Sequence, residues 1–214
     1  MQSRHQHFKI KISVSGAAET SACGEESLIK AAELGREIGR QGAMLISGAT
    51  TGIPFWAAKG IKEVGGVSVG LSPAASEEEH VDRYKLPLDY MDLIVYTGAG
   101  YSGRDILMTR SSDAVLIGCG RIGTIHEFTV AFEDNKPVGI LQGPWSTDEV
   151  IQIIIEKSNR AKDNQKIVYD SNPKILVEKI IELVKKDKRE YYKVYDNGDK
   201  FDVDCDGVTC KTAL

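Results

Sequence analysis

The sequence predicts a doubly wound α/β fold, in which a mostly parallel sheet carries helices on both faces within one Rossmann-like domain. The first reason is an alternation of two hydrophobic periods from residue 9 to about residue 186: short β-branched runs give way to stretches with an apolar residue every three or four positions. The second is that glycine directly follows several of the short runs. The third is size, because 214 residues with 42% hydrophobic content suffice for one well-buried core and are few for two domains.

The short apolar runs predict strands at residues 9–15, 44–47, 67–71, 93–97, 114–117, 137–141 and 166–169. The amphipathic stretches predict helices at residues 26–40, 55–64, 104–111, 124–134, 147–159 and 173–186. Because helices of this length between strands act as crossovers, neighbouring strands should run parallel. Ligands of such a sheet are expected beyond the carboxyl ends of its strands.

The segments outside this pattern have their own signals. We expect residues 1–8 to be extended or disordered, residues 9–188 to form the Rossmann-like domain, and residues 189–214 to form a hairpin tail that turns at Asn197 and Gly198. Residues 73–89 are interpreted as a loop or mobile flap. The tail contains a D-x-D-x-D-G pattern typical of calcium loops, but Ala213 stands where a bidentate glutamate is needed, so we expect no calcium there.

Composition narrows the class of partner. The net charge is only -4, and the 27% of charged residues include both signs throughout, which disfavours nucleic acid and membrane surfaces and favours a small molecule. The polar start of the chain and its short apolar runs predict a cytoplasmic protein. The cysteines show no paired spacing, so we expect reduced thiols at Cys23, Cys119, Cys205 and Cys210.

Glycine-rich loops follow four of the predicted strands. They contain Ser15 and Gly16 after the first strand, Gly48 and Gly52 after the second, and residues 98–103 and 118–123 after the fourth and fifth. Each loop leads into a helix, whose first N–H groups lack intrahelical partners and carry partial positive charge. The loops therefore predict a phosphate-binding site, with glycine allowing close approach of the backbone.

Two of these loops match G-x-G-x-x-G, the fingerprint of dinucleotide binding. That fingerprint also requires an acidic residue about 20 positions later, where this chain has Gly118 and Gln142, so an oxidoreductase is disfavoured. The stretch from Thr124 to Glu127 could be a capping box, and it is no H-E-x-x-H zinc motif because Val130 replaces the second histidine. We expect no metal and no cofactor.

One constellation resembles a known family. Arg104, Met108, Asp113, Ala114, Gly123, Thr124 and Glu127 resemble the R…M…DA…PGGxGTxxE core of the LOG (Lonely Guy) family, once labelled lysine decarboxylase-like, and of related Rossmann-fold nucleotide-binding proteins. Residues 47–53 are similar to that family's GGGxxGL loop, and residues 65–73 to its GGxVxGIxP strand. The resemblance covers roughly residues 9–142.

The resemblance implies a nucleoside 5′-monophosphate site, for a ligand such as AMP, with the phosphate held at Gly120, Gly123 and Thr124. LOG enzymes hydrolyse the N-glycosidic bond and release the base and ribose 5-phosphate. Glu127 would then be the carboxylate that stabilises the oxocarbenium-like centre, and Arg104 would anchor the phosphate or polarise the departing base. The resemblance also implies a homodimer.

The chain departs from the family pattern beside these residues. Cys119-Gly120-Arg121 replaces the family's PGG, and Gly103 and Asp105 replace the acid and lysine that flank the arginine. Arg121 would either add charge to a phosphate site or point to solvent. Two functions therefore stay open: a phosphoribohydrolase, or a non-catalytic carrier or sensor of a phosphorylated nucleotide or pterin cofactor, as molybdenum-cofactor carrier proteins of similar fold are.

Overall fold

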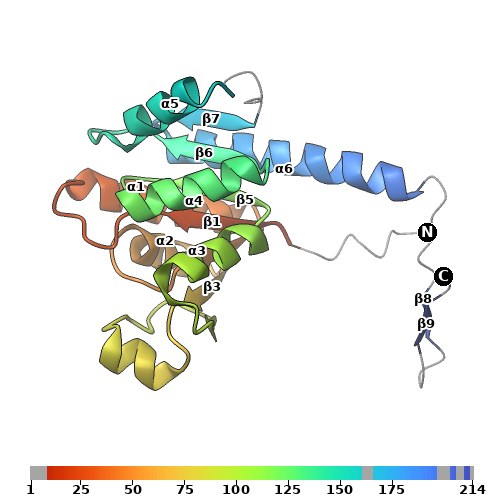
Figure 1. Ribbon diagram of the computed structural model, residues 1–214, viewed down its shortest axis with the longest axis horizontal. Coiled ribbons are helices and arrows are strands. Elements are labelled where there is room, and N and C mark those ends of the chain that lie inside the picture. Colours follow the sequence, from red (N-terminus) through yellow and green to blue (C-terminus); the bar gives the residue numbers. More distant parts are fainter. Residues whose placement is uncertain (1–8, 161–165, 197–202, 206–209, 213–214) are drawn as a thin grey trace.

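The computed structural model describes residues 9–160, 166–196, 203–205 and 210–212. Within them, seven parallel strands form one sheet in the order β4-β3-β2-β1-β5-β6-β7 (Figure 1). The strands are β1 (Lys11–Ser15), β2 (Met44–Ser47), β3 (Val67–Ser72), β4 (Leu93–Tyr96), β5 (Ala114–Ile117), β6 (Val138–Leu141) and β7 (Ile167–Asp170). The helices are α1 (Glu25–Arg40), α2 (Ile53–Glu63), α3 (Gly100–Ser111), α4 (Ile122–Glu133), α5 (Thr147–Lys157) and α6 (Pro173–Asp196). The predicted Rossmann-like α/β fold is confirmed.

The strand order reverses beside β1. That strand pairs with β2 on one side and with β5 on the other, and Ser15 and Ile117 stand opposite each other at the carboxyl ends. This is the topological switch point of the sheet, where open α/β sheets hold their ligands. The loops that leave β1 and β5 are therefore the segments that matter most for a binding site.

Helices cover both faces of the sheet. Helices α1, α2 and α6 lie on one face and α3, α4 and α5 on the other (Figure 1). The first layer buries Leu34 and Ile180 against the strands, and the second buries Phe128 and Ile151. Met108 on α3 is buried in the core, where it packs with Ile46 and Leu71. These apolar contacts hold the strand ends in register.

Helices α1 and α2 approach each other at two glycines. A Cβ atom on Gly35 would lie 1.9 Å from the carbonyl oxygen of Ala57, and one on Gly60 would lie 1.9 Å from that of Ala32. The two backbones are thus in direct contact, which only glycine permits.

The region expected to be a loop or flap contains a short π-helix, η2 (Glu79–Arg83). It is anchored by His80, which is fully buried. The Nδ1 atom of His80 lies 2.8 Å from the Ser72 hydroxyl, and its Nε2 atom lies 3.1 Å from the Pro87 carbonyl oxygen. A buried imidazole with two hydrogen-bond partners ties this segment to the end of β3, which the acidic run of its sequence did not indicate.

The C-terminal prediction needs correction. Helix α6 continues to Asp196, so residues 189–196 of the predicted hairpin tail are helical. An antiparallel pair does follow, formed by β8 (Val203–Cys205) and β9 (Cys210–Thr212). Outside the described residues lie the predicted turn at Asn197 and Gly198, the N-terminal segment 1–8, and Asp202, Asp206 and Gly207 of the D-x-D-x-D-G pattern. Among the described helices, none combines the length and apolarity that a membrane span requires.

Candidate functional site

The loops after β1 and β5 are bound to each other at the switch point. The Ala17 N–H donates to the Cys119 carbonyl oxygen at 2.8 Å, and the Ile53 N–H at the start of α2 donates to the Ala17 carbonyl oxygen at 2.9 Å. Three of the predicted glycine loops therefore lie together: a hydrogen bond joins the loops after β1 and β5, and the loop after β2 is joined to them at Ile53, where α2 begins. We call residues 16–24 and 118–121 the switch-point loops.

Four of the five glycines predicted to approach a phosphate are packed against protein atoms. A Cβ on Gly16 would lie 2.5 Å from the Ile53 side chain, one on Gly52 would lie 2.1 Å from the Ala17 carbonyl oxygen, and one on Gly120 would overlap Thr124. At Gly48 the Cβ would lie 1.5 Å from Nη1 of Arg104, so this glycine makes room for that guanidinium. Each of these four glycines has a packing reason that does not involve a ligand.

Gly123 differs from the other four. A Cβ there would meet no atom within 4 Å. Gly123 is the second residue of α4, whose N-cap is Arg121, and the Ile125 N–H donates to the Arg121 carbonyl oxygen at 3.1 Å. The N–H groups of residues 122–124 precede this bond, so they lack intrahelical partners and lie at the positive end of the helix dipole. The space beside Gly123 is thus open, and the same turn carries backbone donors that lack intrahelical partners.

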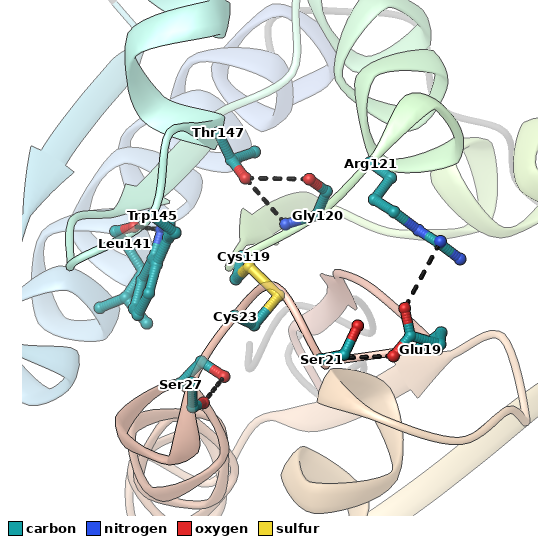
Figure 2. The surroundings of a disulfide bond; sticks show 11 residues. Glu19, Ser21, Cys23, Ser27, Cys119, Gly120, Arg121, Leu141, Trp145 and Thr147 are labelled. Atoms are coloured by element: carbon teal, nitrogen blue, oxygen red, sulfur yellow. Dashed lines mark hydrogen bonds and ion pairs between the residues drawn. A yellow bond between two sulfur atoms is a disulfide. The ribbon is translucent and has the colours of Figure 1, made fainter.

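Figure 2 shows Gly120 and Arg121, the two residues that precede α4, and the side chains around them. The Gly120 N–H donates to the Thr147 hydroxyl at 2.8 Å, and that hydroxyl donates to the Gly120 carbonyl oxygen at 3.1 Å, so the Gly120 amide is already engaged. The Arg121 side chain is 62% exposed, and its Nη1 lies 3.6 Å from a carboxylate oxygen of Glu19. Arg121 thus faces solvent at the start of α4 and pairs with an acid of the opposite loop.

A buried network joins the two predicted catalytic residues. The Ser15 hydroxyl donates to the Glu127 carboxyl, which also shares a hydrogen bond with Asp105. Nε of Arg104 lies 3.0 Å from the Asp105 carboxylate, and its Nη1 donates to the Leu71 carbonyl oxygen at 3.4 Å. Arg104 and Glu127 are only 5% and 7% exposed. The structure therefore brings this pair together through Asp105, beneath the surface of the site.

Burial, and after it the neighbouring Asp105 carboxylate, raise the pKa of Glu127 to about 8, against the opposing effects of the hydrogen bond from Ser15 and the charge of Arg104. At neutral pH the Glu127 carboxyl is therefore mostly protonated. A neutral carboxyl can donate a proton or a hydrogen bond, but it carries no negative charge with which to stabilise a cation.

The T-x-x-E stretch is not a capping box. The N-cap is Arg121, so Thr124 is the third residue of the helix rather than its cap. Glu127 lies in the second turn and bonds Ser15 on another strand. Glu127 therefore takes part in the buried hydrogen-bond network and does not cap the helix.

The sequence reasoning missed two features of this site. Asp105 was seen only as a departure from the family pattern, although it stands next to Arg104. The expectation of reduced thiols is wrong for Cys23 and Cys119, which form a disulfide across the switch-point loops (Figure 2). The two cysteines are 96 positions apart, so no spacing rule reveals the pair; the one signal was a cysteine between two glycines of the predicted phosphate loop.

A separate cavity of about 360 Å³ lies at the opposite, amino edge of the sheet. Several of its charged groups pair with one another: Asp113 pairs with Lys11 at 3.3 Å and with Lys188 at 3.1 Å, and Arg110 pairs with Asp134 at 3.1 Å. Asp113 is thus a structural residue at the entrance of β5. We assign no ligand to this cavity.

The fold of this chain is similar to solved structures of molybdenum cofactor binding and carrier proteins. The chain resembles the structure of a molybdenum cofactor binding protein from the phototrophic bacterium Rippkaea orientalis, with a TM-score of 0.66 and 26% identity over 85% of this chain and 99% of the other. It is also similar to a molybdenum cofactor carrier protein from Chlamydomonas reinhardtii, with a TM-score of 0.63 and 27% identity over 84% and 98% of the two chains.

Sequence comparison agrees with the structural one. An uncharacterized protein of Archaeoglobus fulgidus is 33% identical over 135 residues, which are 63% of this chain and 82% of that protein. The sequence profile of the SLOG cluster4 family matches residues 9–177, which include both switch-point loops and the buried network. The predicted LOG-like relationship is confirmed, and the chain belongs to the SLOG cluster4 family.

Proposed function

We propose that this chain binds a small phosphorylated ligand of the nucleoside 5′-monophosphate class at the start of α4, and that it acts as a carrier or sensor. One observation carries the proposal: the open turn at Gly123, which bears the N–H groups of residues 122–124 without intrahelical partners and directly follows the exposed Arg121. Backbone donors at a helix N-terminus together with a guanidinium suit a phosphate dianion.

The buried network supports a binding role over hydrolysis. The role that the LOG resemblance implies for Glu127 needs an ionised carboxylate facing the sugar, whereas this carboxyl is buried and mostly protonated at neutral pH. Arg104 is occupied by Asp105 and by the Leu71 carbonyl group. The molybdenum cofactor binding and carrier proteins with a similar fold support a carrier role, and they make a phosphorylated pterin the alternative ligand.

Calorimetric titration with AMP, GMP, CMP and UMP tests binding. Arg121→Ala removes the exposed cation, and we expect affinity to fall about tenfold, since a charge-assisted contact contributes about 1.4 kcal/mol or more. Arg110→Ala is the matched control: Arg110 is 65% exposed and ion-paired, like Arg121, but lies at the amino edge of the sheet. Absence of binding by all four nucleotides, or equal losses in both variants, would contradict the proposal.

Gly123→Ala tests the same site from the backbone side. The added methyl group meets no protein atom, so the fold should accept it, but it enters the space where the phosphate would approach the N–H groups. We expect weaker nucleotide binding without loss of stability. Unchanged affinity in this variant would place the ligand elsewhere.

Phosphoribohydrolase activity is the second candidate, favoured by one feature. A carboxyl with a pKa near 8 is protonated at neutral pH and could protonate a departing base, as a general acid does. Incubation with AMP, followed by assay of free adenine and ribose 5-phosphate, tests this, with Glu127→Gln as the control. If AMP binds and no base is released, the enzymatic role is excluded for AMP.

A further inference from the structure

We propose that the Cys23–Cys119 disulfide controls the phosphate site: it holds the Glu19 carboxylate against Arg121, and its reduction raises the affinity for the phosphorylated ligand. This inference rests on the function proposed above, because it concerns regulation of the same site. It follows from three observations: how residues 18–24 are anchored, what holds the opposite loop, and where Glu19 stands.

Residues 18–24 are attached to the rest of the protein mainly through one buried side chain. Their residues are exposed or half-buried, except Cys23, which is 3% exposed. Cys23 lies in the apolar core together with Cys119 and Trp145. The segment's other contacts are single polar ones, such as the Thr51 hydroxyl on the Ala18 carbonyl oxygen at 3.0 Å. The disulfide is therefore the principal anchor of this exposed segment.

The loop on the other side of the disulfide is held independently. The Cys119 carbonyl oxygen accepts the Ala17 N–H at 2.8 Å, and Gly120 is bound to Thr147 through both its amide and its carbonyl group. Breaking the sulfur–sulfur bond leaves these contacts in place. Reduction should thus release residues 18–24 while the start of α4 keeps its position.

Glu19 is the residue of the released segment that affects a ligand. The Ser21 N–H donates to its carboxylate at 2.7 Å, and this hydrogen bond lowers the pKa of Glu19, so the carboxylate is ionised at neutral pH. It lies 3.6 Å from Arg121, the cation that we assign to the phosphate (Figure 2). A phosphate dianion arriving at Arg121 must displace or face this negative charge. The disulfide, four residues along the chain, keeps the charge there.

The redox step is an ordinary thiol–disulfide exchange. A thiolate of a dithiol reductant attacks one cysteine sulfur, which forms a mixed disulfide and releases the other cysteine as a thiolate; the second thiolate of the reductant then attacks the reductant sulfur of the mixed disulfide and releases the first cysteine. The products are the Cys23 and Cys119 thiols and the oxidised, disulfide form of the reductant, so two electrons and two protons are transferred to the protein. Because both sulfurs are buried, the exchange requires local opening of residues 18–24.

The test is AMP titration of the oxidised protein, of the protein reduced with dithiothreitol, and of the Cys23→Ser, Cys119→Ser double variant, with the redox state of each sample verified by mass spectrometry. Loss of a surface ion pair that competes with the ligand should tighten binding roughly two- to fivefold on reduction. Glu19→Gln should tighten binding of the oxidised protein by a similar factor and abolish most of the redox effect. Glu25→Gln, an exposed acid at the start of α1, is the matched control and should change neither.

Two outcomes would overturn the inference: equal AMP affinity in both redox states, or weaker binding after reduction, which would mean that the disulfide preorganises the site. Hydrogen exchange measured by mass spectrometry provides a readout without ligand. Reduction should speed exchange in residues 18–24 and leave residues 118–124 protected. If AMP binds to none of the forms, the proposed function fails, and the exchange measurement then decides by itself whether the disulfide anchors this segment.

Discussion

Protonation of the buried Glu127 should make the stability of this protein fall as the pH rises. Burial raises the pKa of Glu127 to about 8 in the folded state, whereas the ordinary value is 4.5. Between these two values the unfolded chain has lost the proton and the folded protein keeps it. The stabilising contribution of the protonated carboxyl is thus fully present below pH 4.5 and is lost progressively as the pH rises through 8.

The size of this effect follows from the two pKa values. Each pH unit in the window costs about 1.4 kcal/mol, so from pH 5 to pH 9 the effect amounts to about 4 kcal/mol. The carboxyl is almost completely buried, so solvent screening removes little of it. Glu127→Gln keeps the shape of the protonated side chain and cannot ionise. The free energy of unfolding of the wild type, relative to this variant, should fall by about 4 kcal/mol across that range.

Urea unfolding of both proteins, followed by tryptophan fluorescence at half-unit steps of pH, measures this difference. Subtracting the variant cancels most of the other titrating groups. Glu79→Gln is the control: a backbone hydrogen bond from Ala75 lowers the pKa of the half-buried Glu79, so this acid is ionised throughout the range and the curve of the variant should parallel the wild type. The prediction would be refuted if the free energy of unfolding of the wild type, relative to Glu127→Gln, changed by less than about 1 kcal/mol between pH 5 and pH 9.

Four further predictions concern stability and assembly. Reducing the disulfide, which closes a loop of 96 residues, should lower the free energy of unfolding by up to about 4.7 kcal/mol in the chain-entropy estimate; an unchanged urea midpoint would contradict this. Gly35→Ala places a methyl group against the Ala57 carbonyl group and should destabilise the protein by about 1–3 kcal/mol or more, visible as a lower Tm. Gly123→Ala should instead stabilise α4 by up to about 1 kcal/mol, and a lower Tm in this variant would show that the turn is not open. We expect a homodimer from the LOG resemblance, and light scattering that gives the monomer mass at micromolar concentration would reject it.

The fold could be predicted from the sequence because its evidence is local. Strands β2 and β5 begin and end at the predicted residues, since a short apolar run closed by glycine determines its own boundaries. The starts of α3 and α4 were placed two to four residues late, because glycines of the predicted loops belong to the first helical turn. Local preference assigns glycine to loops, whereas the helix dipole and the crossover geometry decide where the first turn begins.

The candidate site could be predicted only in outline. Glycine loops at the carboxyl ends of β1 and β5 do lie together, as the alternation of strands and helices requires. Their individual roles were beyond the sequence, because Gly48 accommodates Arg104 and Gly120 packs on Thr124, while Gly123 alone of the five predicted glycines faces open space. Whether a glycine admits a ligand or a neighbouring side chain depends on atoms from other segments.

The sequence by itself determined the alternating elements, the parallel crossovers and the family motif, because each can be recognised from the order and spacing of residues along the chain. Only the tertiary structure decided that Ser15, Asp105 and Glu127 share one buried network and that Cys23 meets Cys119. The physical reason is that desolvation and disulfide formation depend on distance in space, whereas Ser15 and Glu127 are 112 positions apart in the chain and Cys23 and Cys119 are 96 apart. The charge state of Glu127 and the anchoring of residues 18–24 are therefore consequences of packing.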